Sequence, residues 1–112
     1  MTEADFRKLA LSLPDTEESA HMSHPDFRAG GKIFATLRSP SIGWGMVKLT
    51  PDQQELFVKI APDIFQPVKG GWGRGGATNV NLKNAKKKIT REALLTAWTN
   101  VTSPRGRGKA SR

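Results

Sequence analysis

Cysteine is absent from this chain of 112 residues, and no long run of apolar residues occurs in it. The missing cysteine excludes disulfide bonds, thiolate metal ligands, cysteine-held iron–sulfur clusters and a cysteine nucleophile. No window approaches the roughly 18 consecutive apolar residues of a membrane-spanning helix. The first residues, Thr2 to Asp5, lack the basic and apolar regions of a secretory signal. We therefore expect a cytoplasmic protein that makes no membrane contact.

Acidic residues are almost missing from the last part of the chain. Residues 1–82 carry equal numbers of basic and acidic side chains, whereas residues 83–112 carry nine Lys or Arg and only Glu92. The whole formal charge of +8 therefore lies in this last segment. Local charge of one sign attracts polyanions, of which nucleic acid is the commonest in a cell. A solubilising segment with no dedicated partner is the alternative, because short basic tails bind phosphate weakly and without specificity.

The remaining sequence predicts one small domain with three helices. The helices are expected over residues 4–13, 51–61 and 91–101, where apolar residues recur at helical spacing. The first two have capping boxes, formed by Thr2 with Asp5 and by Thr50 with Gln53, and Pro51 adds a helix-start signal. Thr90 is the predicted cap of the third helix. In the second helix Leu56, Phe57, Ile60 and Ala61 are expected to form the buried stripe.

Six short segments between the helices predict strands, at residues 17–23, 26–29, 32–38, 43–49, 65–68 and 77–82. Gly30 and Gly31 are expected to form a tight hairpin turn, since both residues can adopt positive φ. In the return strand Ile33, Ala35 and Leu37 should share one face, with Phe34 and Thr36 on the other. Short links between strands favour an antiparallel sheet. The predicted fold is an α+β two-layer sandwich, in which an antiparallel sheet is backed by the N- and C-terminal helices.

Residues 103–112 contain no apolar residue larger than alanine. Such a segment cannot bury enough surface to offset the entropy of ordering it. We therefore expect a domain over residues 1–102 and a disordered basic tail over 103–112.

The loop from Lys69 to Gly76 is the most unusual segment, because glycine occupies five of the seven positions 70–76. An exposed Trp72 would stack on a nucleic-acid base or wedge into a groove, and Arg74 would contact phosphate. Alternatively, Trp72 folds back to cap the sheet while the glycines permit tight turns. The sequence leaves both interpretations open.

Two further basic groups lie near the C-terminus. The tail segment around Arg105, Arg107 and Lys109 resembles an AT-hook, whose Arg-Gly-Arg centre enters the minor groove of A·T-rich DNA. Gly108 stands where that motif usually has proline, and a generic cationic tail is the alternative. Lys86, Lys87 and Lys88 precede the third helix, where positive charge opposes the helix dipole. Phosphate contact and simple solvation explain these lysines equally well.

No established catalytic motif is present. The sequence lacks a G-x-S-x-G elbow and a P-loop, and its one G-x-G-x-x-G string precedes a predicted strand instead of opening a helix. His21 and His24 are three residues apart, and strand residues at that spacing point to opposite faces, whereas a turn at Pro25 would let the two side chains converge. No third metal ligand is evident. We expect neither an enzyme nor a bound metal or cofactor.

The order and spacing of several short segments resemble the MmcQ/YjbR family across roughly residues 3–101. The segments are His24-Pro25-Asp26-Phe27-Arg28, Gly31–Ala35, Lys48-Leu49, Gly71-Trp72-Gly73, Thr78–Leu82 and Ala97-Trp98. The resemblance implies a small bacterial protein with a fold similar to bacterial frataxin, described as CyaY-like or double-wing. It also implies DNA binding, by analogy with that double-wing description. Iron binding does not carry over, because Arg7 and Lys8 accompany the two acidic residues of the first helix.

Together these observations predict a non-enzymatic module, a monomer or weak dimer, that binds duplex DNA through salt-sensitive contacts. The expected contacts are Lys69, Trp72 and Arg74 in the loop, Lys86, Lys87 and Lys88 before the third helix, and Arg105, Arg107 and Lys109 in the tail. The alternative is a module that binds a protein partner or a small ligand in a cleft between sheet and helices. Phe34, Trp44 and Met46 would line that cleft, and the tail would be incidental.

Overall fold

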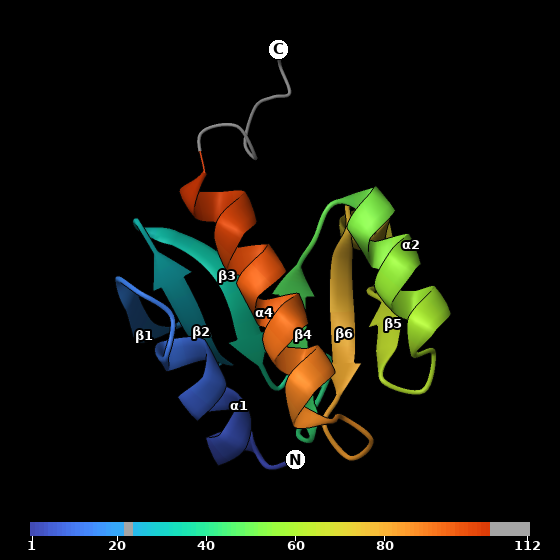
Figure 1. Cartoon of the computed structure of the whole chain (residues 1–112), viewed down its shortest axis with the longest axis horizontal. Helices are drawn as coiled ribbons and strands as arrows, with labels where there is room; N and C mark the ends of the chain where they lie inside the picture. The colour runs from blue at the N-terminus through green and yellow to red at the C-terminus, as the bar shows by residue number, and fades with distance from the viewer. Residues whose placement is uncertain (22–23, 104–112) are drawn as a thin grey trace.

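One sheet of six antiparallel strands organises the computed structural model, which describes residues 1–21 and 24–103 (Figure 1). The strands in their spatial order are β1 Thr16–His21, β2 His24–Ala29, β3 Lys32–Leu37, β4 Trp44–Lys48, β6 Ala77–Asn81 and β5 Phe65–Pro67. The hairpin turn between β2 and β3 is the predicted one, with positive φ at Gly30 and Gly31. The chain crosses over only once in the sheet order, where β6 lies between β4 and β5.

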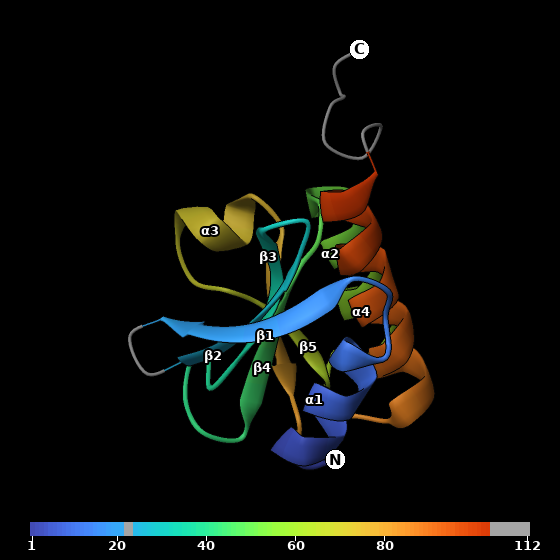
Figure 2. The same cartoon turned by 90° about the vertical axis from the view of Figure 1, so that its left-hand side faces the viewer.

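The helices are divided unequally between the two faces of the sheet. The long helices α1 Glu3–Leu11, α2 Pro51–Ile60 and α4 Lys87–Thr102 cover one face, which we call the helix face (Figure 1). The short helix α3 Gly71–Arg74 lies over the opposite face, which we call the α3 face (Figure 2). The predicted α+β sandwich with terminal helices behind an antiparallel sheet is confirmed.

Local hydrogen bonds start α1 and α2 at the predicted residues. In α1 the Thr2 hydroxyl accepts from the Asp5 N–H at 3.1 Å, and the Thr2 N–H donates to the Asp5 carboxylate at 2.9 Å. Thr50 and Gln53 form the same reciprocal pair in α2, at 3.2 and 2.9 Å. The bond from Thr2 is also the main reason that the pKa of Asp5 is lowered. Both capping boxes therefore satisfy helix N–H groups that would otherwise lack partners.

The start of α4 differs from the prediction. The helix begins at Lys87, with Lys86 as its cap, so Thr90 lies inside it and is fully buried. Ile89 explains the difference, because its side chain packs against the core one turn before the expected boundary. Tertiary packing thus extends this helix against an unfavourable run of lysines.

Aromatic side chains dominate the core between the sheet and the long helices. Phe6 and Phe27 meet edge to face with ring centroids 6.2 Å apart, and Phe57 lies 5.2 Å from Phe65. Gly45 makes room for Phe6, since a Cβ atom there would lie 3.0 Å from the Phe6 ring. The predicted burial of Leu56 and Ile60 is wrong, because α2 turns Phe57 and Ala61 to the core. Leu56 and Ile60 are 55% and 61% exposed.

A register shift in the β2–β3 pairing changes the faces of β3. Phe27 pairs with Ala35, but the next residue, Arg28, pairs with Ile33, so Phe34 is an extra residue in the ladder. Phe34 is consequently buried in the same core cluster as Ala35 and Leu37, while Ile33 is only partly buried. The predicted strict alternation of β3 is therefore wrong at Phe34.

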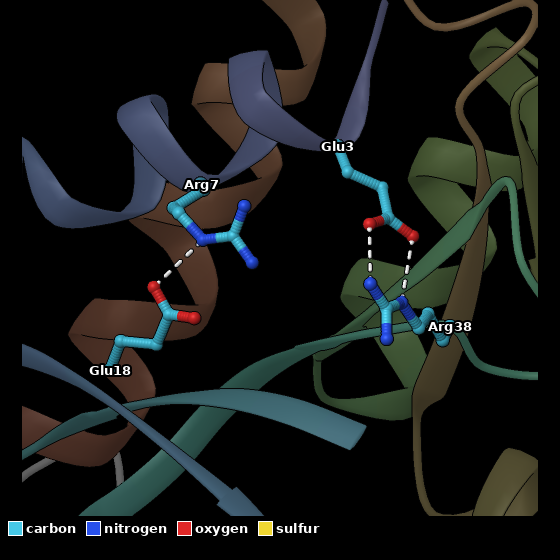
Figure 3. A network of polar contacts seen from close by, with 4 residues as sticks. All are labelled: Glu3, Arg7, Glu18 and Arg38. Atoms are coloured by element: carbon cyan, nitrogen blue, oxygen red, sulfur yellow. Dashed lines mark hydrogen bonds and ion pairs between the residues drawn. The ribbon is translucent and has the colours of Figure 1, made fainter. Parts of the chain in front are cut away.

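Two ion pairs connect α1 to the sheet (Figure 3). Arg38 donates to both carboxylate oxygens of Glu3 at 3.2 Å, and Arg7 donates to Glu18 at 2.8 Å. The bond to Glu3 is the main cause that raises the pKa of Arg38. At the other end of α1, the Trp98 indole N–H donates to the carbonyl of Pro14 at 2.9 Å. In the described part of the chain, no helix is long and apolar enough to cross a membrane.

Candidate nucleic-acid interface

The glycine-rich segment is a fixed structural element, and α3 replaces the open loop that the sequence predicted. Gly73 is buried with its backbone against Val68, and a Cβ atom at Gly73 would lie 1.6 Å from the Val68 carbonyl oxygen. The Gln54 side-chain amide donates to the carbonyls of Gly73 at 3.0 Å and Ala77 at 2.9 Å. Helix α2 therefore holds α3 in place from across the sheet edge.

Gly76 fixes the other end of the segment. Its φ of +113° is a conformation that L side chains rarely adopt, and an added Cβ atom would lie 2.0 Å from the carbonyl oxygen of Leu49. The glycines at positions 73 and 76 thus serve close backbone contacts. The segment predicted as a loop is therefore fixed at both ends by backbone packing.

Trp72 projects from α3 and is 59% exposed. The ammonium nitrogen of Lys48 lies 5.9 Å from the centroid of its ring, within the range of a cation–π contact. Lys69 and Arg74 are exposed on either side of it along the chain. The alternative in which Trp72 folds back as a buried cap is therefore wrong, and one cation, Lys48, lies over its exposed ring.

A row of cross-strand neighbours crosses the sheet beneath this helix. Asp26 pairs with Thr36, Thr36 with Met46, and Met46 with Asn79, so all four residues share the α3 face. All four are buried, and Asn79 is 9% exposed. The Oδ1 atom of Asn79 is buried and has no hydrogen-bond partner among the described residues. Three of these four buried side chains are polar, whereas most buried side chains on the helix face are apolar.

Residues 24–28 alternate between the two faces of the sheet. His24, Asp26 and Arg28 share the α3 face, while Phe27 enters the core on the helix face. Arg28 donates to both oxygens of Asp26, at 2.8 and 3.2 Å. This hydrogen-bonded pair is the main reason that the pKa of Arg28 is raised.

A cavity of about 200 Å³ joins this strand to α3. Its walls are His24 from β2, Thr36 from β3, Ser39 from the following turn and Trp72 from α3. Segments that lie far apart in the sequence, around His24 and around Trp72, therefore form one site. Sequence reasoning missed this cavity and the position of Lys48. The sequence did contain one signal for this arrangement. His24, Asp26 and Arg28 occupy alternate positions, and alternate residues of a strand share one face.

A second hollow, of about 340 Å³, lies on the other side of Trp72. Lys48 and Thr50 line it from the end of β4, and Asn100 and Val101 line it from the last turn of α4. The Asn100 side chain holds this corner together, because its amide donates to the Lys48 carbonyl at 3.1 Å and to Gln53 at 2.8 Å. The C-terminal end of α4 therefore lies beside α3.

The three lysines before α4 lie elsewhere. Lys86, Lys87 and Lys88 are exposed at the first turn of α4, and this helix of 16 residues extends about 24 Å to its other end. Lys87 lines a separate hollow of about 640 Å³ between α1 and α4, together with Lys8 and Arg91. The structure therefore does not bring these lysines together with Lys69, Trp72 and Arg74.

Two further predictions lie outside the described residues. Arg105, Arg107 and Lys109 belong to the unplaced segment 104–112, as does nearly all of the expected disordered tail. The structure also does not describe the side chain of His21. Among the residues it describes, no group of three His, Asp or Glu side chains is arranged to hold a metal ion.

The predicted cleft between sheet and helices is wrong. Phe34 is part of the packed core on the helix face, and Met46 is buried on the α3 face. Trp44 is partly exposed at the start of β4. These three side chains do not line a common surface, because the register shift moves Phe34 to the side opposite Met46.

Comparison with known proteins supports the fold. The YjbR family model matches residues 11–100. A crystal structure of Deinococcus radiodurans protein DR2400, with a DUF419 domain, is similar to this chain with a TM-score of 0.72 and 19% sequence identity. The similarity covers 99% of this chain and 85% of that one. No curated protein matches the chain significantly.

Proposed function

The chain belongs to the YjbR family, and from this premise we propose that the α3 face of the sheet binds duplex DNA without catalysing a reaction. The observation that carries the proposal is the exposed Trp72 ring, held on a rigid support with Lys48 over it and with Lys69 and Arg74 exposed in the same segment of the chain. Exposed aromatic rings stack on bases or wedge between base steps, and adjacent cations neutralise phosphates.

The charge around α3 supports this assignment. No Asp or Glu occurs between Asp63 and Glu92, so acidic neighbours in sequence do not neutralise Lys69 and Arg74. None of the ion pairs found among the described residues involves Lys48, Lys69 or Arg74. These cations are therefore available to an external polyanion, which they attract over distances of about a Debye length.

The basic C-terminal segment supplies further positive charge in the sequence after α4. The last turn of α4 lines the hollow beside Trp72, and the next residues in sequence include Arg105, Arg107 and Lys109. If about five positive charges contact phosphates, the log–log slope of affinity against salt is about −4 to −5.

The proposal is tested by fluorescence anisotropy with a labelled DNA duplex at several salt concentrations. The full chain is compared with a chain that ends at Ser103, which separates the folded domain from the basic tail. Within the full chain we expect Lys48→Ala and Arg74→Ala each to reduce affinity and to make the salt slope shallower by about 1.

Lys87→Ala and Lys88→Ala serve as matched controls, because each removes one charge at the far end of α4. They should change affinity much less than the variants beside Trp72. Equal losses for both pairs would show that general charge, and not the α3 face, attracts the DNA. A salt slope shallower than about −1 would reject the electrostatic contacts altogether.

A further inference from the structure

We infer that the cavity beside Trp72 receives one unpaired nucleobase, an inference that rests on the proposed nucleic-acid function. The walls combine an indole ring from α3 with an imidazole and two hydroxyl groups, from His24, Thr36 and Ser39. Sites for planar heterocycles combine apolar and aromatic walls with a few fixed hydrogen-bonding groups in this way. A nucleobase is the part of a nucleic acid that can use both an aromatic wall and fixed hydrogen-bonding groups.

The size of the cavity limits its ligand to a single ring system. Its volume of about 200 Å³ is below the roughly 300–1,000 Å³ of sites for drug-sized ligands. The sugar and phosphate of a bound nucleotide would therefore remain outside. Outside the cavity, Lys48 lies over Trp72, and Arg74 follows Trp72 by two residues in α3. The base would enter between the sheet and Trp72 while its phosphates face these cations.

The polar groups of the sheet make the cavity suited to a base rather than to an apolar ligand. Thr36 lies between Asp26 and Met46 in the buried row on the α3 face. The hydroxyl groups of Thr36 and Ser39 therefore line the cavity next to a buried polar stretch of the sheet. A purely apolar guest would offer these hydroxyl groups no hydrogen-bond partner, whereas base edges carry donors and acceptors.

A base that is stacked and paired inside a duplex cannot reach this cavity. It must first leave the stack, which costs least where the base has no pairing partner. The cavity therefore predicts a preference for duplexes that contain a bulged base over fully paired ones. Trp72 is the stacking residue, and Thr36 and Ser39 are the residues that contact the base edge.

The test uses the full chain and three end-labelled duplexes of the same sequence context. One is fully paired, one carries a single bulged 2-aminopurine, and one carries an abasic nucleotide at the bulge. We expect the bulged duplex to bind about tenfold tighter than the paired one, because stacking on an aromatic side chain contributes at that level. The abasic bulge should lose this gain, and 2-aminopurine fluorescence should fall as the base stacks on Trp72.

Variants then separate the cavity from the charged surface. Thr36→Val keeps the shape of the side chain and removes the hydroxyl, so it should reduce the preference for the bulge by about fivefold at unchanged affinity for the paired duplex. Thr16→Val makes the same chemical change on β1, outside the cavity, and should leave the preference intact. Trp72→Phe should retain part of the preference that Trp72→Ala abolishes.

Equal affinity for the paired, bulged and abasic duplexes would overturn the inference. The inference would also be overturned if the abasic duplex, or the variants Thr36→Val and Trp72→Ala, kept the full preference for a bulge. The flexibility of the DNA alone would then explain that preference. A free nucleoside monophosphate serves as competitor, and displacement at concentrations comparable to the bulged duplex would identify a free nucleotide, not a strand, as the ligand. The proposed function fails separately, if Lys48→Ala and Arg74→Ala leave binding of the paired duplex unchanged.

Discussion

The two faces of the sheet bury side chains of different polarity, with polar residues more frequent on the α3 face. On the helix face, Phe27, Ala35, Val47 and Val80 pack against three long helices. On the α3 face the neighbouring positions hold Asp26, Thr36, Met46 and Asn79, beneath a helix of four residues. Buried polar groups contribute less to stability than apolar packing and are costly when unsatisfied. Apolar packing on the helix face therefore contributes most to the stability of the fold, and the α3 face is the one that we propose for recognition.

The strongest test of this division is to damage the helix face alone. Phe6→Ala removes a fully buried ring that contacts Phe27, and we expect it to lower the free energy of unfolding by about 3–5 kcal/mol. Urea unfolding followed by circular dichroism measures this loss. At temperatures where the variant stays folded, its affinity for duplex DNA should match that of the unchanged protein. A large loss of affinity in the folded variant would contradict the division.

The reverse test displaces α3 and leaves the core intact. A Cβ atom at Gly73 would overlap the Val68 carbonyl, so Gly73→Ala must move α3 and with it Trp72. We expect DNA affinity to fall about tenfold, comparable to the loss of one stacking contact, with a much smaller change in unfolding. Gly75→Ala is the matched control, because its added Cβ atom would have only ordinary contacts, 3.5 Å from the Trp72 carbonyl oxygen. If Gly73→Ala and Gly75→Ala lost DNA affinity to a similar extent, the fixed position of α3 would not be the cause.

Gln54 connects the two faces, and its removal should produce an intermediate effect. Its side-chain amide donates to Gly73 and Ala77, so Gln54→Ala should cost about 1–2 kcal/mol of stability. In Gln54→Ala, amide hydrogen exchange should become faster at residues 71–76 and change less in α4. Gln66→Ala changes an exposed glutamine on β5 and should have neither effect. Unchanged exchange in Gln54→Ala would show that Gly73 packing alone fixes α3.

The smallest effect concerns a surface contact of the helix layer. The hydrogen bond from Thr2 lowers the pKa of Asp5 below its ordinary value of 3.8, so the ionised carboxylate stabilises the folded state. This contribution is present above the unfolded pKa and is lost as pH falls through the folded pKa. Asp5→Asn should therefore reduce stability slightly near neutral pH, and the difference should shrink below about pH 4. Thermal unfolding at both pH values measures it, and a difference that grows on acidification would contradict the assignment.

Local features of the fold were predictable from the sequence, because their causes lie within a few residues. Thr2 and Thr50 form capping boxes with residues three positions later, and Gly30 and Gly31 form the hairpin turn. The early start of α4 was not predictable in the same way, since it depends on Ile89 meeting a distant core. The position of Phe34 depends on a pairing shift between two strands, which periodicity within one strand does not contain.

The candidate site was predictable only in part, for the same reason. The composition of residues 69–76 identified Trp72 and Arg74 as unusual. The contacts that make them a site come from elsewhere in the chain: Gln54 supports α3, Lys48 lies over Trp72, and His24 faces the cavity. The sequence groups Lys86, Lys87 and Lys88 with the other cations, but the length of α4 separates them from α3.

The most direct test of the proposed interface is a titration of the isotope-labelled full chain with duplex DNA, followed by amide chemical shifts. We predict that the largest shifts occur at residues 69–76, at Lys48 and at His24. Residues of α1 and the first turn of α4 should stay nearly unchanged. Shifts concentrated at Lys8, Lys87 and Arg91, with none around Trp72, would place the interface on the helix face and contradict the account.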